Sequence, residues 1–203
     1  MEMEMSNIKK YIVVTSINKK TDAIKAFEKF KEWNLVIVGD KKSYNLIEKN
    51  NLKYLSVVKQ KKIQSKFSSI CPYNSYVRKN IGYLYSFSKD ADIIYETDDD
   101  NIPYKNWHLP DFKSNKEITT NSKFINILRY FTEKKIWPRG LPLEEILKFK
   151  NIKTRNIKNK KIGVWQSLAD LDPDVDAIYR LIINKKIKFK KKRAVSIRKN
   201  DRI

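Results

Sequence analysis

Residue types on which many protein functions depend are scarce in this sequence of 203 residues. Its one cysteine, Cys71, excludes an intrachain disulfide. Its one histidine, His108, lacks an evident serine or cysteine partner for a hydrolytic triad. None of the four glycines belongs to a phosphate-binding loop of the P-loop or Rossmann kind. These absences argue against disulfide scaffolds, triad hydrolases and P-loop enzymes.

Long apolar segments are also missing. No apolar run approaches the roughly 20 residues that a membrane-spanning helix needs. The first ten residues, MEMEMSNIKK, lack the apolar core of a signal peptide. With a single cysteine, nothing indicates an oxidising compartment. The sequence therefore predicts a cytoplasmic protein, or at most one peripheral to a membrane.

Positive charge, in contrast, is abundant. The chain has 44 Lys and Arg against 23 Asp and Glu, a formal net charge of +21. Such an excess favours an anionic partner: a nucleic acid, a membrane surface or a phosphorylated substrate. It is concentrated toward the C-terminus, in residues Lys148 to Lys161 and Lys185 to Arg193. AT-rich coding would also enrich Lys, Asn and Ile, and this alternative stays open.

Short apolar runs alternate with helical patterns over the first half of the chain. At 41% hydrophobic residues, the chain is rich enough in them for a globular core. Strand-like runs followed by helical ones predict an α/β fold, a mostly parallel sheet with helices on both faces. The predicted strands are Tyr11–Ser16, Leu35–Val38, Leu52–Val58 and Asp92–Glu96, the first and fourth being neighbours. The predicted helices are Thr21–Trp33 (with Thr21 as N-cap), Ser43–Asn50 and Asn74–Ser88, with a loop over 60–72.

Polar residues follow the predicted strands where a ligand would bind. In open parallel sheets, ligands bind beyond the carboxyl ends of the strands, where the strand order reverses. The residues at those ends are Thr15, Ser16 and Asn18 after the first strand, Asp40 after the second, and Asp98 to Asn101 after the fourth. They would share one edge of the sheet, as a single nucleotide site requires.

Three consecutive carboxylates, Asp98, Asp99 and Asp100, follow the fourth strand. Mn²⁺ and Mg²⁺ prefer oxygen ligands, and often use one or two carboxylates together with substrate phosphate oxygens. In extended backbone Asp98 and Asp100 point the same way, so they are predicted to share one metal. A solvated acidic turn is the alternative.

Two further groups of charged residues are candidates for chemistry. Arg78 and Lys79, on the third predicted helix, could bind a diphosphate, the alternative being a solvated basic face. Asp170 and Asp172 lie in an alternating acidic stretch that extends to Asp176. A carboxylate there could take the proton of an acceptor in an inverting sugar transfer, or the acids could cap a helix beginning near Pro173.

Together these stretches resemble the STELLO-type (DUF288) family of glycosyltransferases, and more distantly the reversibly glycosylated polypeptides, which act as UDP-arabinopyranose mutases. The matching segments are IVVTSIN (12–18), VIVGDKK (36–42), PYNSYVRKNIGYL (72–84), IYETDDDN (94–101), WPRG (137–140), and VWQ (164–166) leading to DPDVDA (172–177). They cover most of residues 11 to 181.

The resemblance implies a GT-A fold, a nucleotide-sugar donor, most often a UDP-sugar, and an acceptor that is a glycan, lipid or protein. It implies that Asp98 to Asp100 form the metal and diphosphate motif, and it places Asp40 near the nucleoside and Arg78 near the phosphates. The mutase-like relatives self-glycosylate an arginine before a Gly-Val-Pro turn, which Arg139 matches loosely. The implied glycosyltransferase domain covers residues 11–184, between an extension (1–10) and a basic segment (185–203).

Three alternatives stay open. Because family members usually continue past the point where this chain ends, it could be a catalytically reduced nucleotide-sugar-binding protein. A nucleotidyltransferase would share the fold and the metal, although it usually has a glycine-rich loop after the first strand, where this chain reads SINKKT (16–21). A basic nucleic-acid-binding protein would explain the charge, but not three carboxylates at a strand end.

Overall fold

The computed structural model describes residues 8–49, 51–119, 123–148, 152–189 and 194–197. It divides the chain into two compact units, Met1–Trp107 and His108–Ile203. This division falls inside the single domain that the sequence predicted over residues 11–184. Most of the predicted extension (1–7 of 1–10) and residues 190–193 and 198–203 of the basic segment lie outside the described residues.

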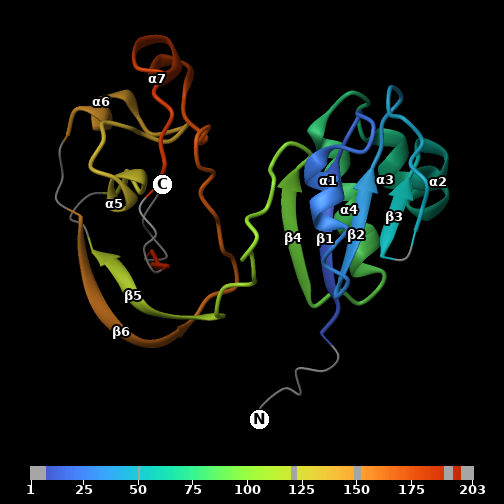
Figure 1. The fold of residues 1–203 in the computed structure, drawn as a ribbon, viewed down its shortest axis with the longest axis horizontal. Coiled ribbons are helices and arrows are strands. Elements are labelled where there is room, and N and C mark those ends of the chain that lie inside the picture. Colours follow the sequence, from blue (N-terminus) through green and yellow to red (C-terminus); the bar gives the residue numbers. More distant parts are fainter. Residues whose placement is uncertain (1–7, 50, 120–122, 149–151, 190–193, 198–203) are drawn as a thin grey trace. The chain divides into compact units, whose positions relative to one another are not determined.

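The first unit is built on a four-stranded parallel sheet (Figure 1). Its strands are β1 (Lys10–Thr15), β2 (Trp33–Val38), β3 (Leu52–Leu55) and β4 (Ile93–Asp98). Their order is β3-β2-β1-β4, so β1 pairs with β2 on one side and with β4 on the other. The predicted α/β class and the predicted pairing of the first and fourth strands are therefore confirmed, and the strand order reverses between β1 and β4.

Helices cover both faces of this sheet, as predicted. Figure 1 shows α1 (Asp22–Phe27) on one face and α2 (Val57–Ile63), α3 (Ser65–Ile70) and α4 (Lys79–Phe87) on the other. Thr21 caps α1 as expected, its side chain accepting a hydrogen bond from the Ile24 N–H. A 3-10 turn, η2 (Tyr76–Arg78), leads into α4. The central strands are buried on both faces, which explains their nearly continuous apolar sequence.

Three local predictions were wrong. Among the described residues of 43–50, there is no helix. The predicted strand over 52–58 ends at Leu55, because Ser56 caps α2 through a hydrogen bond from the Lys59 N–H. Residues 60–72, predicted as a loop, contain most of α2 and all of α3. Their polarity was misleading, since the Gln60 side chain is buried and donates to the Gly39 and Leu55 carbonyls, both at 2.7 Å.

An aromatic cluster closes the α1 face of the sheet. Trp107 packs against Tyr95 of β4 with ring centroids 4.8 Å apart, against Trp33 of β2 at 5.2 Å, and against Phe27 of α1 at 5.8 Å. Residue 107 is thereby fixed to the sheet, and the Pro- and aromatic-rich segment after β4 returns to the core.

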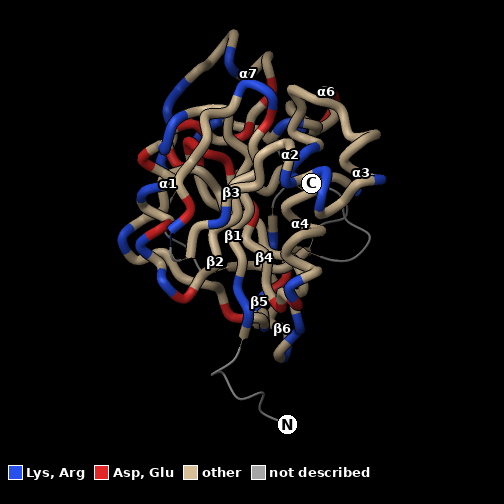
Figure 2. The backbone as a smooth tube through the Cα atoms, turned by 90° about the vertical axis from the view of Figure 1, so that its right-hand side faces the viewer, with Lys and Arg blue, Asp and Glu red and all other residues tan. Residues whose placement is uncertain are grey.

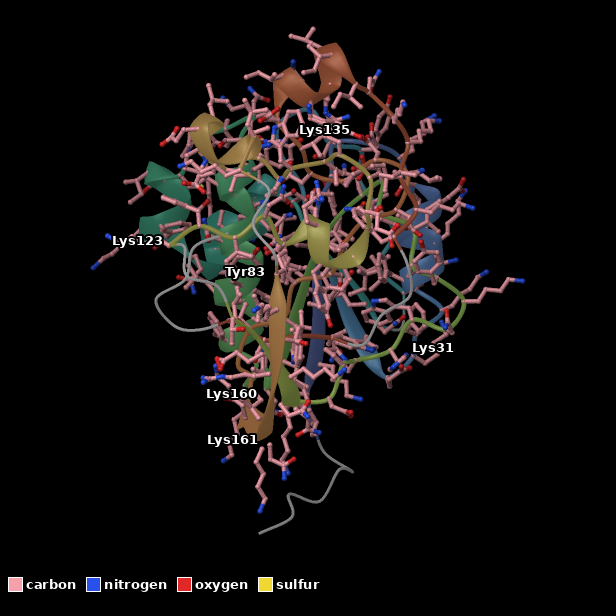
Figure 3. The ribbon with its side chains drawn as sticks, turned by 90° about the vertical axis from the view of Figure 1, so that its left-hand side faces the viewer. Lys31, Tyr83, Lys123, Lys135, Lys160 and Lys161 are labelled. Carbon is pink, nitrogen blue, oxygen red and sulfur yellow. The ribbon has the colours of Figure 1, made fainter. Side chains whose placement is uncertain are left out.

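The second unit contains a two-stranded antiparallel sheet, β5 (Lys113–Thr119) and β6 (Lys153–Lys161). It also contains the short helices α5 (Leu128–Phe131), α6 (Leu143–Ile146) and α7 (Ala177–Ile182). Trp137 and Tyr179 pack edge to face at its core, with centroids 5.2 Å apart. The strands were not predicted: β6 forms from the basic stretch, and Lys160 and Lys161 lie together at its end (Figure 3).

Basic residues occur on elements throughout both units (Figure 2). Within the part of the chain that the structure describes, no helix combines the length and the apolar character needed to cross a membrane.

Candidate functional site

The carboxyl ends of three strands meet at one edge of the first unit. Thr15, the last residue of β1, lies opposite Val38 of β2 and opposite Asp98 of β4. The segments that leave these strands begin with Ser16, Gly39 and Asp99, so they start side by side. The predicted gathering of these polar residues at one edge is thus present in the structure.

Asp99 connects the end of β4 to the loop after β1. Its Oδ2 atom accepts hydrogen bonds from Ser16 Oγ at 2.5 Å and from Asn18 Nδ2 at 2.9 Å. Its backbone carbonyl accepts from Thr21 Oγ1 at 2.6 Å. Three predicted ligand-binding residues are therefore bonded to one another, and Asp99 sets the shape of the loop that leads into α1.

Asp40 shapes the neighbouring loop after β2. Its Oδ1 atom accepts from the Lys41 N–H at 2.7 Å, and its own N–H donates to Ser43 Oγ at 2.6 Å. Ser43 in turn donates to the Ser16 carbonyl at 2.7 Å, which joins the β2 loop to the β1 loop. The Oγ1 atom of Thr15 is buried, with no hydrogen-bond partner among the described residues.

Asp98 is paired with Lys79, the first residue of α4. The Lys79 ammonium donates to Asp98 Oδ1 at 2.8 Å and to Glu96 Oε1 at 2.9 Å. Burial alone would lower the pKa of Lys79, but the hydrogen bonds to Asp98 and Glu96 outweigh it and raise the pKa, so this lysine stays charged. Burial, with a hydrogen bond to Glu96, raises the pKa of Tyr83, which lies on the same helix (Figure 3).

The predicted contact of Lys79 with a donor phosphate is therefore not present in this arrangement. Its ammonium is directed to the carboxylates of β4, because Glu96 and Asp98 are two residues apart and share the sheet face that α4 covers.

The carboxylates offer oxygen ligands for a metal, but the structure limits how many come from the protein. Extended backbone ends at Asp98, and Asp99 and Asp100 lie in a turn, so the alternation that placed Asp98 and Asp100 on one side does not continue. Among the described residues, no three His, Cys, Asp or Glu side chains are grouped to hold a metal ion. Asp100 is exposed and forms no hydrogen bond to any described residue, and Asp98 Oδ2 is likewise unbonded. These oxygens fit Mn²⁺ or Mg²⁺ bound by one or two carboxylates, the rest of its ligands coming from a phosphate and water.

Arg78 has a different role from the one the sequence suggested. Its side chain is only 1% exposed. The guanidinium donates to Gln60 Oε1 at 2.5 and 3.1 Å and to the Cys71 carbonyl at 2.9 Å, and its carbon lies 4.5 Å from the centroid of the Tyr73 ring. With its donors committed to internal acceptors, Arg78 ties α2 and the segment after α3 to the start of α4. This corrects its assignment as a diphosphate ligand.

The candidate catalytic residues lie in the second unit. Asp170 Oδ1 accepts from the Phe189 N–H at 2.8 Å, whereas Asp172, whose side chain is 77% exposed, pairs with Arg180 at 2.6 Å. Arg139 pairs with Asp174 at 2.7 Å on the surface. Asp176 caps α7 and accepts from Trp137 Nε1 at 2.5 Å, so the capping alternative holds for this member of the set.

Similarity to known proteins extends across both units. The chain is 27% identical over 190 residues to the probable glycosyltransferase STELLO2 of Arabidopsis thaliana, and 26% identical over 186 residues to the probable glycosyltransferase STELLO1 of the same plant.

The chain resembles the STELLO proteins. Each match covers 84% of this chain, which is more than either unit contains, and 24% of the STELLO protein. The chain thus spans about a quarter of the length of these relatives. No protein-family model matches it. The resemblance that the sequence motifs indicated is confirmed.

Three residues of this site were missed in the sequence: Glu96, Tyr83 and Ser43. Glu96 was visible as a charged residue directly after the apolar run 93–95, two positions before Asp98, which is a signal that it shares the face of the aspartate. Tyr83 lies four positions after Lys79, one helical turn away, and so on the same side of α4. No comparable signal marks Ser43.

Proposed function

We propose that this chain is a glycosyltransferase that binds a nucleotide-sugar donor, with UDP as the nucleotide, at the carboxyl edge of its parallel sheet. One observation carries the proposal: three consecutive carboxylates begin at Asp98, the last residue of β4, beside β1, where the strand order reverses. The similarity to two probable glycosyltransferases supports it.

The first unit would hold the donor. Asp98 and Asp100 are the proposed ligands of Mn²⁺ or Mg²⁺, which when bound would neutralise charge on the donor diphosphate. Asp99 acts as the support of the β1 loop, through its bonds to Ser16 and Asn18. Two more residues complete the edge against which the nucleotide would lie. They are Thr15, whose buried hydroxyl has no hydrogen-bond partner among the described residues, and Asp40, near the start of the loop after β2.

The second unit supplies the candidates for the transfer step. In an inverting transfer a carboxylate takes the proton of the acceptor hydroxyl while the acceptor oxygen bonds to the anomeric carbon. The bond from that carbon to the diphosphate breaks, and its electron pair leaves with UDP. Asp172 suits the base better than Asp170, because its side chain is exposed and pairs with Arg180 at the surface, whereas Asp170 accepts a backbone N–H. Arg139, with an exposed side chain, remains the candidate for mutase-like self-glycosylation.

Calorimetry of UDP binding tests the donor site. We expect tighter UDP binding with Mn²⁺ than with a chelator, because the metal joins carboxylate and diphosphate. The double substitution of Asp98→Ala and Asp100→Ala should remove this difference and leave the fold intact, since both side chains are exposed and Glu96 still accepts a hydrogen bond from Lys79. The double substitution of Glu32→Ala and Asp111→Ala, which removes two exposed carboxylates elsewhere, should keep it. Equal UDP affinity of the unmodified protein with Mn²⁺ and with the chelator would overturn the metal-dependent site.

A further inference from the structure

Lys79 is a buried cation inside the carboxylate site. Its side chain is 8% exposed, whereas those of its partners Glu96 and Asp98 are 58% and 53% exposed. Burying an ammonium is costly unless it is paired, and here two carboxylates accept from it. The lysine therefore approaches the carboxylates from the protein interior and leaves their outer sides to solvent.

The packing of α4 explains why the lysine is held there. Gly82, one turn after Lys79, lets the helix approach the sheet so closely that a β-carbon at position 82 would come 2.5 Å from Val13 Cγ1. The residue before Lys79 is the buried Arg78, whose internal hydrogen bonds fix the start of the helix. Because Gly82 holds α4 against the sheet and Arg78 fixes the start of the helix, the Lys79 side chain has little freedom to turn toward a ligand.

We propose that Lys79 is a built-in counter-ion of the carboxylate site, which positions Asp98 and weakens the binding of a divalent metal in the absence of nucleotide. This inference rests on the proposed function, because it concerns the same metal site. Residues 96–100 carry four carboxylates, and Lys79 already neutralises part of their charge and occupies Asp98 Oδ1. A divalent cation must share Asp98 with this ammonium and is repelled by it. Tight metal binding then needs the additional negative charge of a diphosphate, so metal and donor bind together.

Titration with Mn²⁺ alone tests the proposal on the full chain. Lys79→Met keeps the length of the side chain and removes its charge. We expect Mn²⁺ to bind this variant roughly tenfold more tightly than the unmodified protein, the effect of removing one positive charge close to the ion. The affinity for UDP without metal should stay within about twofold, because Lys79 does not contact the phosphates in this proposal. Lys59→Met, which removes a lysine paired with Glu48 away from the site, should leave Mn²⁺ binding unchanged.

A second variant keeps the test decisive if Lys79→Met does not fold. Lys79→Gln retains hydrogen-bond donors for Glu96 and Asp98 without the charge, and should show the same gain in Mn²⁺ affinity. Unchanged Mn²⁺ affinity, or no Mn²⁺ binding to any folded variant, would overturn the proposal. A loss of UDP affinity without metal of tenfold or more would also overturn it, because Lys79 would then contact the phosphate. The Mn²⁺-only titration is independent of UDP, so a protein that binds Mn²⁺ as expected but not UDP would contradict the proposed donor and leave the role of Lys79 standing.

Discussion

Gly82 of α4 lies against Val13 of β1 so closely that no side chain fits between them. A β-carbon at position 82 would stand 2.5 Å from Val13 Cγ1 and 2.8 Å from Val38 Cγ2. Both neighbours are β-branched, buried and on the two central strands of the sheet, so neither can move aside easily. This close approach brings the start of α4, with Arg78 and Lys79, against the carboxyl edge of the sheet.

We therefore expect Gly82→Ala to lower the free energy of unfolding by about 1–3 kcal/mol, the usual cost of overpacking a core. The sign of this change in unfolding free energy is informative, because a Gly→Ala substitution inside an unobstructed helix stabilises the helix by roughly 1 kcal/mol. Urea denaturation followed by circular dichroism gives the measurement. Gly163→Ala is the matched control: no atom lies within 4 Å of its would-be β-carbon, so little change is expected. A stabilised Gly82→Ala variant would contradict the close packing.

Arg78 should contribute to stability rather than to nucleotide affinity. Replacing it by Lys leaves acceptors at Gln60 and Cys71 without the planar donor group that satisfies them. We expect Arg78→Lys to lower the free energy of unfolding by about 2–4 kcal/mol, since unsatisfied buried acceptors are costly. The affinity of the folded protein for UDP, measured by calorimetry below the unfolding transition, should change little. If the variant is as stable as the parent but binds UDP tenfold more weakly, then Arg78 contacts the diphosphate after all.

Asp99 and Asp100 are adjacent carboxylates with different surroundings, and they should behave differently. Asp99→Ala removes the acceptor for Ser16 and Asn18, and we expect it to cost about 1–2 kcal/mol of stability. Asp100→Ala removes an exposed carboxylate, and its effect on stability should stay within about 0.5 kcal/mol. Thermal unfolding of the two variants side by side makes the comparison. Equal stability losses would mean that the bonds of Asp99 do not hold the loop.

The response to acid should depend on Glu48. Burial alone would raise the pKa of this carboxyl, but hydrogen bonds from Lys59, Lys53 and the Tyr54 N–H outweigh it and lower the pKa from 4.5 to about 2. A lowered folded-state pKa means that Glu48 stabilises the fold above pH 4.5 and that this contribution is lost as the pH falls toward 2.

Glu48→Gln should thus be less stable than the parent at neutral pH and approach its stability at low pH. Denaturation at a series of pH values tests this, and Glu32→Gln, at an exposed position, is the control. Parallel pH profiles for the parent and Glu48→Gln would show that the ion pairs of Glu48 do not stabilise the fold.

Local patterns in the sequence were enough to predict the parallel sheet and the position of its carboxyl edge. The four strands are short apolar runs, and the turn and capping signals that separate them, such as Thr21, act over a few residues. Because strands alternate with helices, the parallel order and the pairing of the first and fourth strands followed, and with them the meeting of Asp98, Ser16 and Asp40 at one edge.

Only the tertiary structure decided what the charged residues of that edge contact. Arg78 and Lys79 are adjacent cations in the sequence, yet the first points into the core and the second to Glu96 and Asp98. This is so because Gly82 allows α4 to pack directly against the sheet. The polar sequence around Gln60 predicted a loop, but its side chain is buried and donates hydrogen bonds to the carbonyls of Gly39 and Leu55. The basic run that forms β6 likewise needed β5 as a partner, about 40 residues away. In each case the partner is distant in sequence, and the free energy of burying and pairing a polar group depends on that partner rather than on the residues beside it.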